Sequence, residues 1–329
     1  MRQINNFTPQ ALLRGVFFCL AIILLPSCDK PPESPDWPSH SESTEPQAAT
    51  GLPTLPLSSV INTDVETTFM VYNIKNYLSQ PRGETIQSKP KDEIKDLIDN
   101  ILEVQPDILG ICEIGTNADL KDLQQRLKNH GLHLPHSHLM GGADAYRRQA
   151  ILSKFPLKAY DTAKIEFTYN SARHIILRGI LDVSINLPGG ETRFVGAHLK
   201  SKRENKYFDQ ALIRRNEAQL VRQHVDLILE STPDLIVYGD FNDTKQSPSV
   251  RAIAGDHGSL NYLSPLNLTD SNGQKWTHYW GYQDIYSRFD YAFVSQSMKS
   301  RIDMKQSYIL NIPQENQASD HRPLVITIY

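Results

Sequence analysis

This chain of 329 residues has few cysteines, a small net charge and no long apolar run. Each of these features excludes a class of protein. Three cysteines cannot build a disulfide framework. The 34 basic and 37 acidic side chains leave a net charge of −3, which argues against a strongly basic nucleic-acid-binding protein. With 40% hydrophobic and 22% charged residues, the composition also excludes wholesale disorder, a collagen-like fibre and a polytopic membrane protein. A globular protein with a packed core remains.

An apolar run near the N-terminus, residues 15–25, is shorter than the roughly 20 residues that a membrane-spanning helix needs. Arginines precede the run, and a positive segment followed by a short apolar one is typical of a secretory signal peptide. The run ends in Leu25-Pro26-Ser27-Cys28, which resembles a bacterial lipobox. We therefore predict a lipoprotein signal peptide over residues 1–27, and a lipid anchor on Cys28 that holds the secreted protein at a membrane of the bacterial cell envelope. An ordinary signal peptide followed by an unmodified cysteine is the alternative.

Proline, serine and threonine dominate the next segment, residues 28–62. Such a segment cannot bury enough apolar surface to offset the entropy of ordering its chain. Proline-rich stretches also favour extended, semi-rigid conformations. We predict a disordered tether here, followed by one folded domain over residues 63–329.

Hydrophobic periodicity predicts that this domain mixes helices and strands. The apolar positions Ile94, Leu97, Ile98 and Ile101 recur at helical spacing and predict an amphipathic helix over residues 92–103. Further helices are expected at residues 120–129 and 212–229. Strands are expected at residues 67–73, 107–112, 149–153, 175–186, 192–199, 235–238, 291–295 and 324–328.

Polar side chains stand directly before or after several of these strands, where a packed sheet would hold them firmly. One such residue alone is more often a cap or turn residue than a ligand, because Asp and Asn favour turns through local hydrogen bonds. The set therefore has to be judged together. Its members are Glu113, His198, Asp240, Asn242, Asp290, Asp320 and His321.

Together these segments resemble the endonuclease/exonuclease/phosphatase superfamily, which includes pancreatic-type DNases, neutral sphingomyelinases and inositol-polyphosphate phosphatases. The resemblance covers residues 67–329 and implies an α/β fold: two packed β-sheets flanked by helices, a four-layer α/β sandwich with the site at one end. The matching segments are Val71-Tyr72-Asn73, Pro106–Glu113, Ala197-His198-Leu199, Tyr238–Asp243, Phe289-Asp290-Tyr291 and Ser319–Leu324.

The resemblance also implies a divalent metal ion. Glu113 would be its principal ligand, with Asn73 beside the ion and Asp320 adding a ligand directly or through water. Mg²⁺ is the expected cofactor and Mn²⁺ a substitute, since hard cations take oxygen ligands. The sequence has no cysteine–histidine cluster for structural zinc.

The remaining members of the set have catalytic roles in the family. By resemblance, Asp240 and Asn242 would activate and orient the attacking water. His321 would contact the phosphate or the water, and Asp290 would support its charged form, since an acidic partner raises the pKa of a histidine. His198 would hydrogen-bond the scissile phosphate and help the leaving oxygen.

Basic residues after His198 suggest an anionic substrate, with a solvated surface loop as the alternative. The predicted substrate-binding residues are Arg173, Lys200, Lys202 and Arg203. Asp144, Arg147 and Arg148 precede another strand, and spacing alone does not decide which of them belongs to the site. The aromatic-rich residues 276–286 could stack nucleic-acid bases or meet lipid headgroups, but we interpret them as partly exposed core.

Two enzymatic hypotheses follow: a metal-dependent nuclease of the cell envelope, which we favour, or a phosphodiesterase or phosphatase acting on phospholipid headgroups or small phosphate esters. Removal of residues 1–27 takes away 2 of the 34 basic side chains and no acidic one, so the net charge becomes −5, which weakens but does not exclude nucleic-acid binding. A catalytically inactive binding module is disfavoured, because Glu113, Asp240 and His321 are all present. We expect a monomer.

Overall fold

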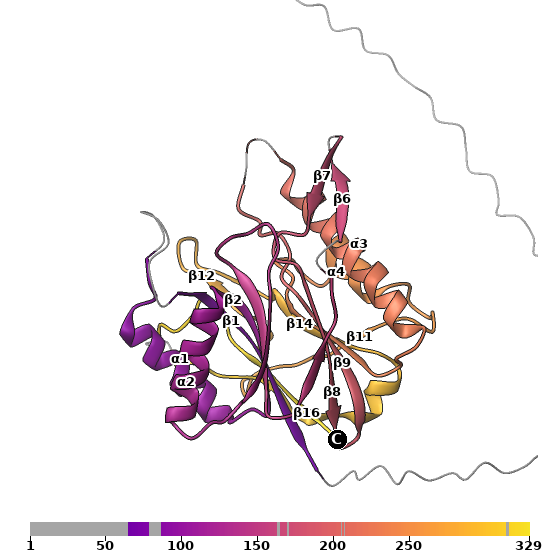
Figure 1. Ribbon diagram of the computed structural model, residues 1–329. Helices are drawn as coiled ribbons and strands as arrows, with labels where there is room; N and C mark the ends of the chain where they lie inside the picture. The colour runs from indigo at the N-terminus through magenta and orange to yellow at the C-terminus, as the bar shows by residue number, and fades with distance from the viewer. Residues whose placement is uncertain are drawn as a thin grey trace, which may run out of the picture. The chain divides into compact units, whose positions relative to one another are not determined.

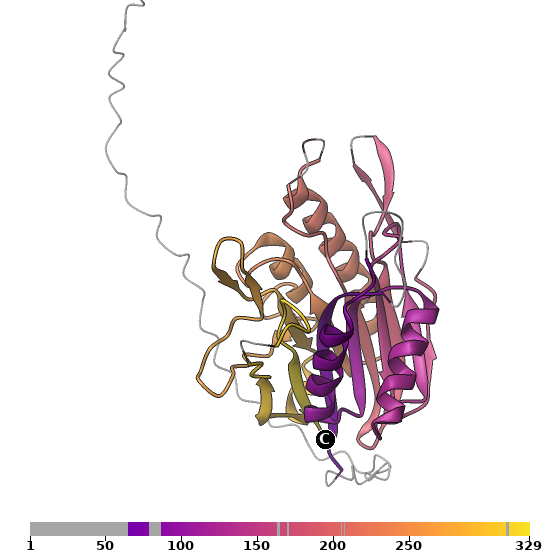
Figure 2. The same ribbon diagram turned by 90° about the vertical axis from the view of Figure 1, so that its left-hand side faces the viewer.

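The computed structural model describes residues 65–78, 87–162, 165–169, 171–204, 206, 208–313 and 316–329. The predicted signal peptide, the lipidated Cys28 and the tether lie outside these residues. Within them, two six-stranded β-sheets pack face to face, and helices cover their outer faces (Figures 1 and 2). The predicted four-layer α/β sandwich is therefore confirmed. None of the helices in the described part of the chain combines the length and the apolar character needed to cross a membrane.

The first sheet has the strand order β15-β16-β1-β2-β4-β3, with β1 and β2 parallel and the other neighbours antiparallel. Helices α1 (Lys91–Val104) and α2 (Asn117–Asn129) lie on its outer face. Its strands are β1 (Thr67–Tyr77), β2 (Ile108–Ile114), β3 (His136–Met140), β4 (Arg148–Ser153), β15 (Ile302–Ile309) and β16 (Leu324–Ile328).

The second sheet repeats this plan with the order β11-β14-β10-β9-β8-β5, again with a central parallel pair, β9 and β10. Helices α3 (Gln210–Leu229) and α4 (Pro248–Ala254) cover its outer face. A short 3-10 helix, η1 (Ser297–Arg301), follows β14. The strands are β5 (Leu157–Ala159), β8 (Ile180–Leu187), β9 (Gly190–Ala197), β10 (Leu235–Asp240), β11 (Ser264–Pro265) and β14 (Asp290–Val294).

The core forms three layers because successive side chains of a strand point to opposite faces of its sheet. In β1, Phe69 packs between the two sheets, where its ring meets Phe194 and Tyr238 edge-on at centroid distances of 5.1 and 5.0 Å. The next residue, Met70, packs outward among the apolar side chains of α1 and α2. The outer face of the second sheet packs in the same way against α3 and α4. Both sheets are therefore buried on both faces, which holds their strands rigidly.

The two central parallel pairs carry the polar segments to the same end of the sandwich. Asn73 lies late in β1 and Glu113 late in β2, while Asp240 ends β10 and pairs directly with Asp290, the first residue of β14. Because the carboxyl ends of parallel strands meet at one edge, residues far apart in sequence come together there.

One predicted strand is wrong in part. We expected one strand over residues 175–186. Instead, β6 (Glu166–Tyr169) and β7 (Ala172–Ile175) form a hairpin that ends at Ile175, and the next strand, β8, begins only at Ile180. Gly179 adopts a left-handed φ of 72°, and the backbone N–H of Leu177 donates to Glu217 of α3 at 3.1 Å. Both features turn the chain between the two strands.

A second hairpin, β12 (His278–Trp280) and β13 (Ile285–Ser287), was not predicted as strand either. Its short strands rise toward the same end of the sandwich as the β6–β7 hairpin (Figure 1). Each strand has only three residues and is flanked by turns. Such a strand is too short to show the hydrophobic alternation by which strands are recognised in a sequence. The two hairpins frame the end at which the polar residues collect.

Candidate active site

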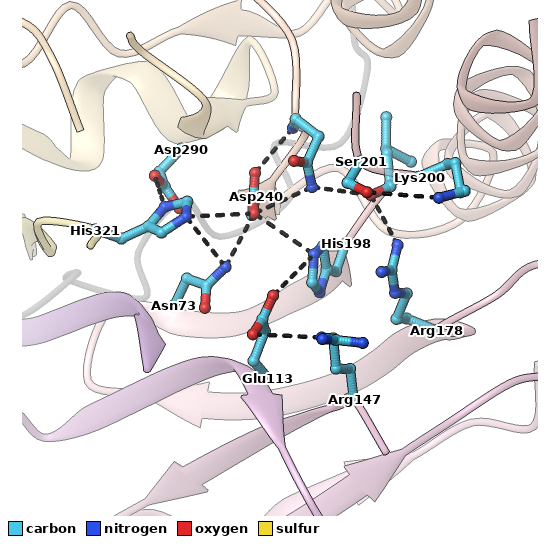
Figure 3. A network of polar contacts seen from close by, with 12 residues as sticks. Asn73, Glu113, Arg147, Arg178, His198, Lys200, Ser201, Asp240, Asp290 and His321 are labelled. Atoms are coloured by element: carbon cyan, nitrogen blue, oxygen red, sulfur yellow. Dashed lines mark hydrogen bonds and ion pairs between the residues drawn. The ribbon is translucent and has the colours of Figure 1, made fainter. Parts of the chain in front are cut away.

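Three buried side chains from three separate segments form a polar chain at this end of the sandwich (Figure 3). The ring of His321 donates from Nδ1 to Oδ2 of Asp290 at 2.7 Å. On the other side of the ring, Nε2 lies 3.8 Å from Oδ2 of Asp240. His321 is therefore held between two carboxylates from neighbouring strands.

This arrangement makes His321 a permanent cation near neutral pH. Burial alone would lower its pKa, but the negative charges of Asp290 and Asp240 outweigh that effect and raise the pKa to about 10. Burial raises the pKa of Asp240 to about 7, against the opposing effect of the His321 charge. The centre thus pairs a charged imidazolium with a carboxylate that can exchange a proton near neutrality.

Two amide side chains fix the orientation of Asp240. Asn73 donates from Nδ2 to Oδ2 of Asp240 at 2.9 Å, and the backbone N–H of Asn242 donates to Oδ1 at 2.8 Å. The side chain of Asn242 adds a further bond to Oδ2 at 3.2 Å. Asn242 has a φ of 51°, a conformation that costs energy for a residue other than glycine and that clusters at functional sites. These bonds leave the carboxylate little freedom to rotate.

Glu113 and His198 stand next to this chain. Nε2 of His198 lies 3.5 Å from Oδ2 of Asp240 and 3.8 Å from Oε1 of Glu113. Burial lowers the pKa of His198 well below its usual range, and the nearby Arg178, His321 and Arg147 lower it further, so the ring is neutral. Its one proton belongs on Nε2, because two carboxylate oxygens lie beside that atom and no described residue bonds to Nδ1. Glu113 also has a left-handed backbone, with a φ of 67°.

A pair of arginines flanks Glu113 and His198. Nε of Arg147 lies 3.6 Å from Oε2 of Glu113, and Nη1 of Arg178 donates to the carbonyl oxygen of Leu199 at 3.1 Å. Asp144 holds both arginines, at 3.7 Å from Arg147 and 3.3 Å from Arg178. Arg147 and Arg178 both line the central cavity, so their charges face any molecule bound there.

These contacts decide the question that spacing left open. Asp144 and Arg147 line the cavity, whereas Arg148 donates from Nη1 to the carbonyl oxygen of Gly115 and does not line it. Arg178 was missed because it falls inside the strand wrongly predicted for residues 175–186. Gly179, directly after it, was the sequence signal for a turn at this point.

The predicted substrate-binding residues divide into two groups. Lys200, Lys202 and Arg203, which follow His198 in the sequence, line the cavity. Arg173 does not: it lies on β7, its side chain is 81% exposed, and it pairs with Glu166 on β6 at 3.3 Å. Arg173 stays outside the cavity because the chain turns after β7, and Arg178 lines the cavity instead.

The cavity has a volume of about 1320 Å³, and besides several acidic side chains its lining contains two chemically distinct groups of residues, which we call its walls. One wall is cationic. The other comes from the β12–β13 hairpin and its surroundings and is aromatic and apolar. The cationic wall consists of Arg147, Arg178, Lys200, Lys202 and Arg203, and the apolar wall includes His278, Trp280, Ile285 and Phe289.

His278 is a further site residue that sequence reasoning missed. Its ring lies 4.7 Å from that of His321, and a backbone bridge joins the two residues. Burial and the charge of His321 lower its pKa to about 4, so His278 is neutral. A histidine outside the recognised motifs carries no sequence signal that separates a site residue from a structural one.

Two sets of side chains at the site could hold a divalent cation. Asp240, Asp290 and His321 offer ligand atoms within 4.8 Å of one another. However, the charged ring of His321 has no free lone pair, and Asp290 already binds that ring. The oxygen atoms of Glu113, Asn73 and Asp320 are the hard donors that Mg²⁺ prefers, and Glu113 and Asp320 line the cavity. By the chemistry of its donors, the second set, which is the predicted one, suits Mg²⁺ better.

Comparisons with known proteins agree with this architecture. A sequence model of the Endonuclease/Exonuclease/phosphatase family matches residues 70–321. No curated protein sequence matches the chain. Among solved structures, the human Nocturnin catalytic domain with bound sulfate anion is 19% identical with a TM-score of 0.56, over 80% of this chain and 94% of that chain.

Two further structures show the same likeness. An endonuclease/exonuclease/phosphatase from Bacteroides vulgatus is 15% identical with a TM-score of 0.56, over 80% of this chain and 99% of that chain. D. rerio TDP2 complexed with a single-strand DNA product is 17% identical with a TM-score of 0.56, over 81% of this chain and 100% of that chain. At such identities the likeness establishes the fold.

Proposed function

The chain belongs to the endonuclease/exonuclease/phosphatase family, and from this premise we propose that it is a divalent-metal-dependent phosphodiester hydrolase that cleaves nucleic acid. The observation that carries the proposal is the buried chain of Asp290, His321 and Asp240 at the base of a cavity with a cationic wall. A charged imidazolium beside an oriented carboxylate suits attack by water on a phosphoryl group, whose negative charge the cations would stabilise.

Each of these residues has its own role in the proposed reaction. Asp240, held by Asn73 and Asn242, accepts the proton of the attacking water. The imidazolium of His321 stabilises negative charge on the phosphoryl oxygens. As the P–O bond breaks, the N–H of His198 donates a hydrogen bond to the leaving oxygen, which then takes a proton from solvent.

A divalent cation is part of the proposal. Glu113, with Asn73 and Asp320, would hold Mg²⁺ or Mn²⁺, which neutralises charge on the phosphoryl group. Arg147 lies beside the same carboxylate and limits the negative charge of the site before substrate binds. Glu113 is therefore the residue on which metal affinity should depend most.

Nucleic acid is the favoured substrate because both walls of the cavity match its parts. Phosphates carry negative charge at regular intervals and meet the cationic wall, and bases offer flat apolar faces to the aromatic wall. TDP2, which has the same fold, is described in complex with a single-strand DNA product. The alternative substrate is a phospholipid headgroup or small phosphate ester, because exposed aromatic side chains such as Trp280 and Tyr282 also occur at lipid interfaces.

A substrate panel tests the proposal. The purified protein with Mg²⁺ should hydrolyse DNA or RNA, lose activity with EDTA and lose it in Asp240→Asn. The exposed acid Asp256 provides a matched control, and Asp256→Asn should retain activity. Hydrolysis of sphingomyelin or inositol phosphates without any cleavage of nucleic acid would favour the alternative. Absence of EDTA-sensitive hydrolysis of every phosphoester would end the proposal of an enzyme.

We further propose that the protein acts at the bacterial cell envelope, anchored by an acyl group on Cys28. The support is the sequence Leu25-Pro26-Ser27-Cys28 after a short apolar run. Cells fed a palmitate analogue should label the wild-type protein and Cys19→Ala but not Cys28→Ala. Equal labelling of both variants would contradict the anchor.

A further inference from the structure

The β12–β13 hairpin presents two different faces, because strand alternation sorts its side chains. The cross-strand pairs His278–Ser287 and Trp280–Ile285 alternate with the pair Tyr279–Tyr286. All four members of the first two pairs line the cavity, whereas neither tyrosine of the third pair does. The hairpin therefore has a cavity face and an outer face.

The outer face anchors the hairpin. The rings of Tyr279 and Tyr286 stack at a centroid distance of 4.6 Å, and Trp276 meets Tyr286 edge-on at 4.9 Å. The guanidinium of Arg322 lies 3.6 Å from the centre of the Trp276 ring and binds Asp270 at 2.8 Å. These contacts attach the hairpin to the segment that carries His321. The cavity face is thus held at a fixed position beside the reaction centre.

The cavity face carries apolar side chains that are not covered by the protein. Trp280 is 46% exposed and Ile285 is 43% exposed, although the two are cross-strand partners. Residues 276–286 were predicted to be partly exposed core, and this face carries part of the exposure. An exposed indole beside a branched aliphatic side chain, inside a cavity, is a flat apolar surface of the kind that binds a planar ring.

The cationic wall reaches the foot of the hairpin. Nζ of Lys202 lies 5.3 Å from the centre of the Phe289 ring, and that ring stacks on His278 at 5.1 Å. His278 in turn lies against His321. The rings that lead outward from the reaction centre therefore lie beside a lysine of the cationic wall.

We propose that Trp280, backed by Ile285, is a subsite that stacks an unpaired nucleobase next to the scissile phosphate, while Lys202 and Arg203 bind a neighbouring phosphate. The inference rests on the proposed nuclease function and narrows its substrate to single-stranded nucleic acid. The face of a base is free to stack only where the base is unpaired and unstacked, as in a single strand or a frayed end. Stacking on an aromatic side chain tolerates any base, so cleavage should show little sequence preference.

The structure favours this occupant over a membrane. The apolar face of the hairpin points into the cavity, and the turn at its tip carries Asp284, whose carboxylate binds the hydroxyl of Tyr279 at 3.1 Å. Burying that charge in a bilayer would be costly. A cavity with a cationic wall matches a chain of phosphates with attached bases.

The test compares two exposed aromatic residues of one hairpin. Trp280→Ala removes the ring from the cavity face, and Tyr286→Ala removes a ring that is 54% exposed on the outer face. Each variant is assayed as the full chain with Mg²⁺ on a single-stranded oligonucleotide and on a strand of equal length made of abasic residues. Trp280→Phe keeps a flat ring, and melting temperatures show whether each variant folds.

The wild-type protein should cleave the oligonucleotide about tenfold more efficiently, in kcat/KM, than the abasic strand. Trp280→Ala should bring that ratio close to one, whereas Trp280→Phe and Tyr286→Ala should keep most of it. An unchanged ratio in Trp280→Ala would overturn the subsite but leave the nuclease proposal standing. If the wild-type protein cleaves neither strand, the subsite proposal falls, and the substrate panel above decides the nuclease proposal separately. Sedimentation with anionic phospholipid vesicles that is lost in Trp280→Ala would assign the residue to a membrane instead.

Discussion

The centre of the cavity and its rim are held in different ways. At the centre, Asp290, His321 and Asp240 are buried and fixed by short hydrogen bonds between strand ends of both sheets. At the rim, Trp280 and Lys202 are about half exposed and come from a hairpin and a loop. The difference suggests that the centre determines the reaction and the rim selects the molecule that undergoes it. Four predictions test this division, from the largest expected effect to the smallest.

The largest effect is expected at the centre. His321→Ala should lower kcat by a factor on the order of 10³, because the phosphoryl charge loses its buried cation. His257→Ala, at an exposed histidine outside the cavity, should leave kcat unchanged. Steady-state kinetics with Mg²⁺ measure both. Wild-type turnover in His321→Ala would remove His321 from the mechanism.

The second prediction concerns the pKa of His321. Asp290→Asn removes the carboxylate that contributes most to raising this pKa to about 10, so the pKa should fall. The wild-type imidazolium persists up to about pH 10 and is lost above it. As the pH rises, the variant should therefore lose activity at a lower pH than the wild-type protein does. Its kcat at the pH optimum should be reduced by about 10².

A pH profile of kcat/KM measures this shift. Its alkaline limb should move toward neutral pH in Asp290→Asn. Asp303→Asn, on β15 and outside the cavity, serves as the control and should leave the limb in place. An alkaline limb in the same position for wild type and Asp290→Asn would show that His321 does not titrate in it.

The third prediction concerns Arg178, in the cationic wall of the cavity. Arg178→Met should raise KM by about tenfold with a smaller change in kcat, because a charged hydrogen-bond donor to the substrate phosphate is lost. Arg173→Met is the matched control, since Arg173 lies outside the cavity, and it should behave as wild type. Equal KM values for the two variants would remove Arg178 from substrate binding.

The smallest effect is expected at the rim. Lys202→Ala should raise KM about threefold at low salt and reduce the slope of log KM against log salt concentration by about one, as expected for one lost phosphate contact. Lys299→Ala, on η1 and outside the cavity, removes the same charge and should not change the slope. A slope that falls equally in both variants would indicate a general effect of net charge.

Much of the centre could be predicted because each of its residues lies beside a buried strand. Glu113 follows a run of apolar residues in β2, and Asp240 is the last residue of β10. The buried sheet therefore fixes the position of each side chain. Recognition of the family then joined these separate segments into one site. The predicted roles of Glu113 as metal ligand and His198 as hydrogen-bond donor stay predictions.

The rim could not be predicted in the same way. Arg178 and Arg173 are only five positions apart, yet the turn between β7 and β8 brings the first into the cavity and leaves the second outside. The aromatic residues 276–286 likewise look like core in composition. Their two faces separate only when β12 pairs with β13.

By itself the sequence determined the family and the α/β architecture, and it named most residues of the candidate site, because hydrophobic patterning and strand-end motifs are local properties of a linear chain. Only the tertiary structure decided which charges face the cavity, that Asp144 rather than Arg148 supports the site, and that Trp280 is exposed beside the reaction centre. Those outcomes depend on turns and cross-strand pairs. In a strand pair, a shift of one residue in register decides whether a side chain enters the cavity or faces solvent.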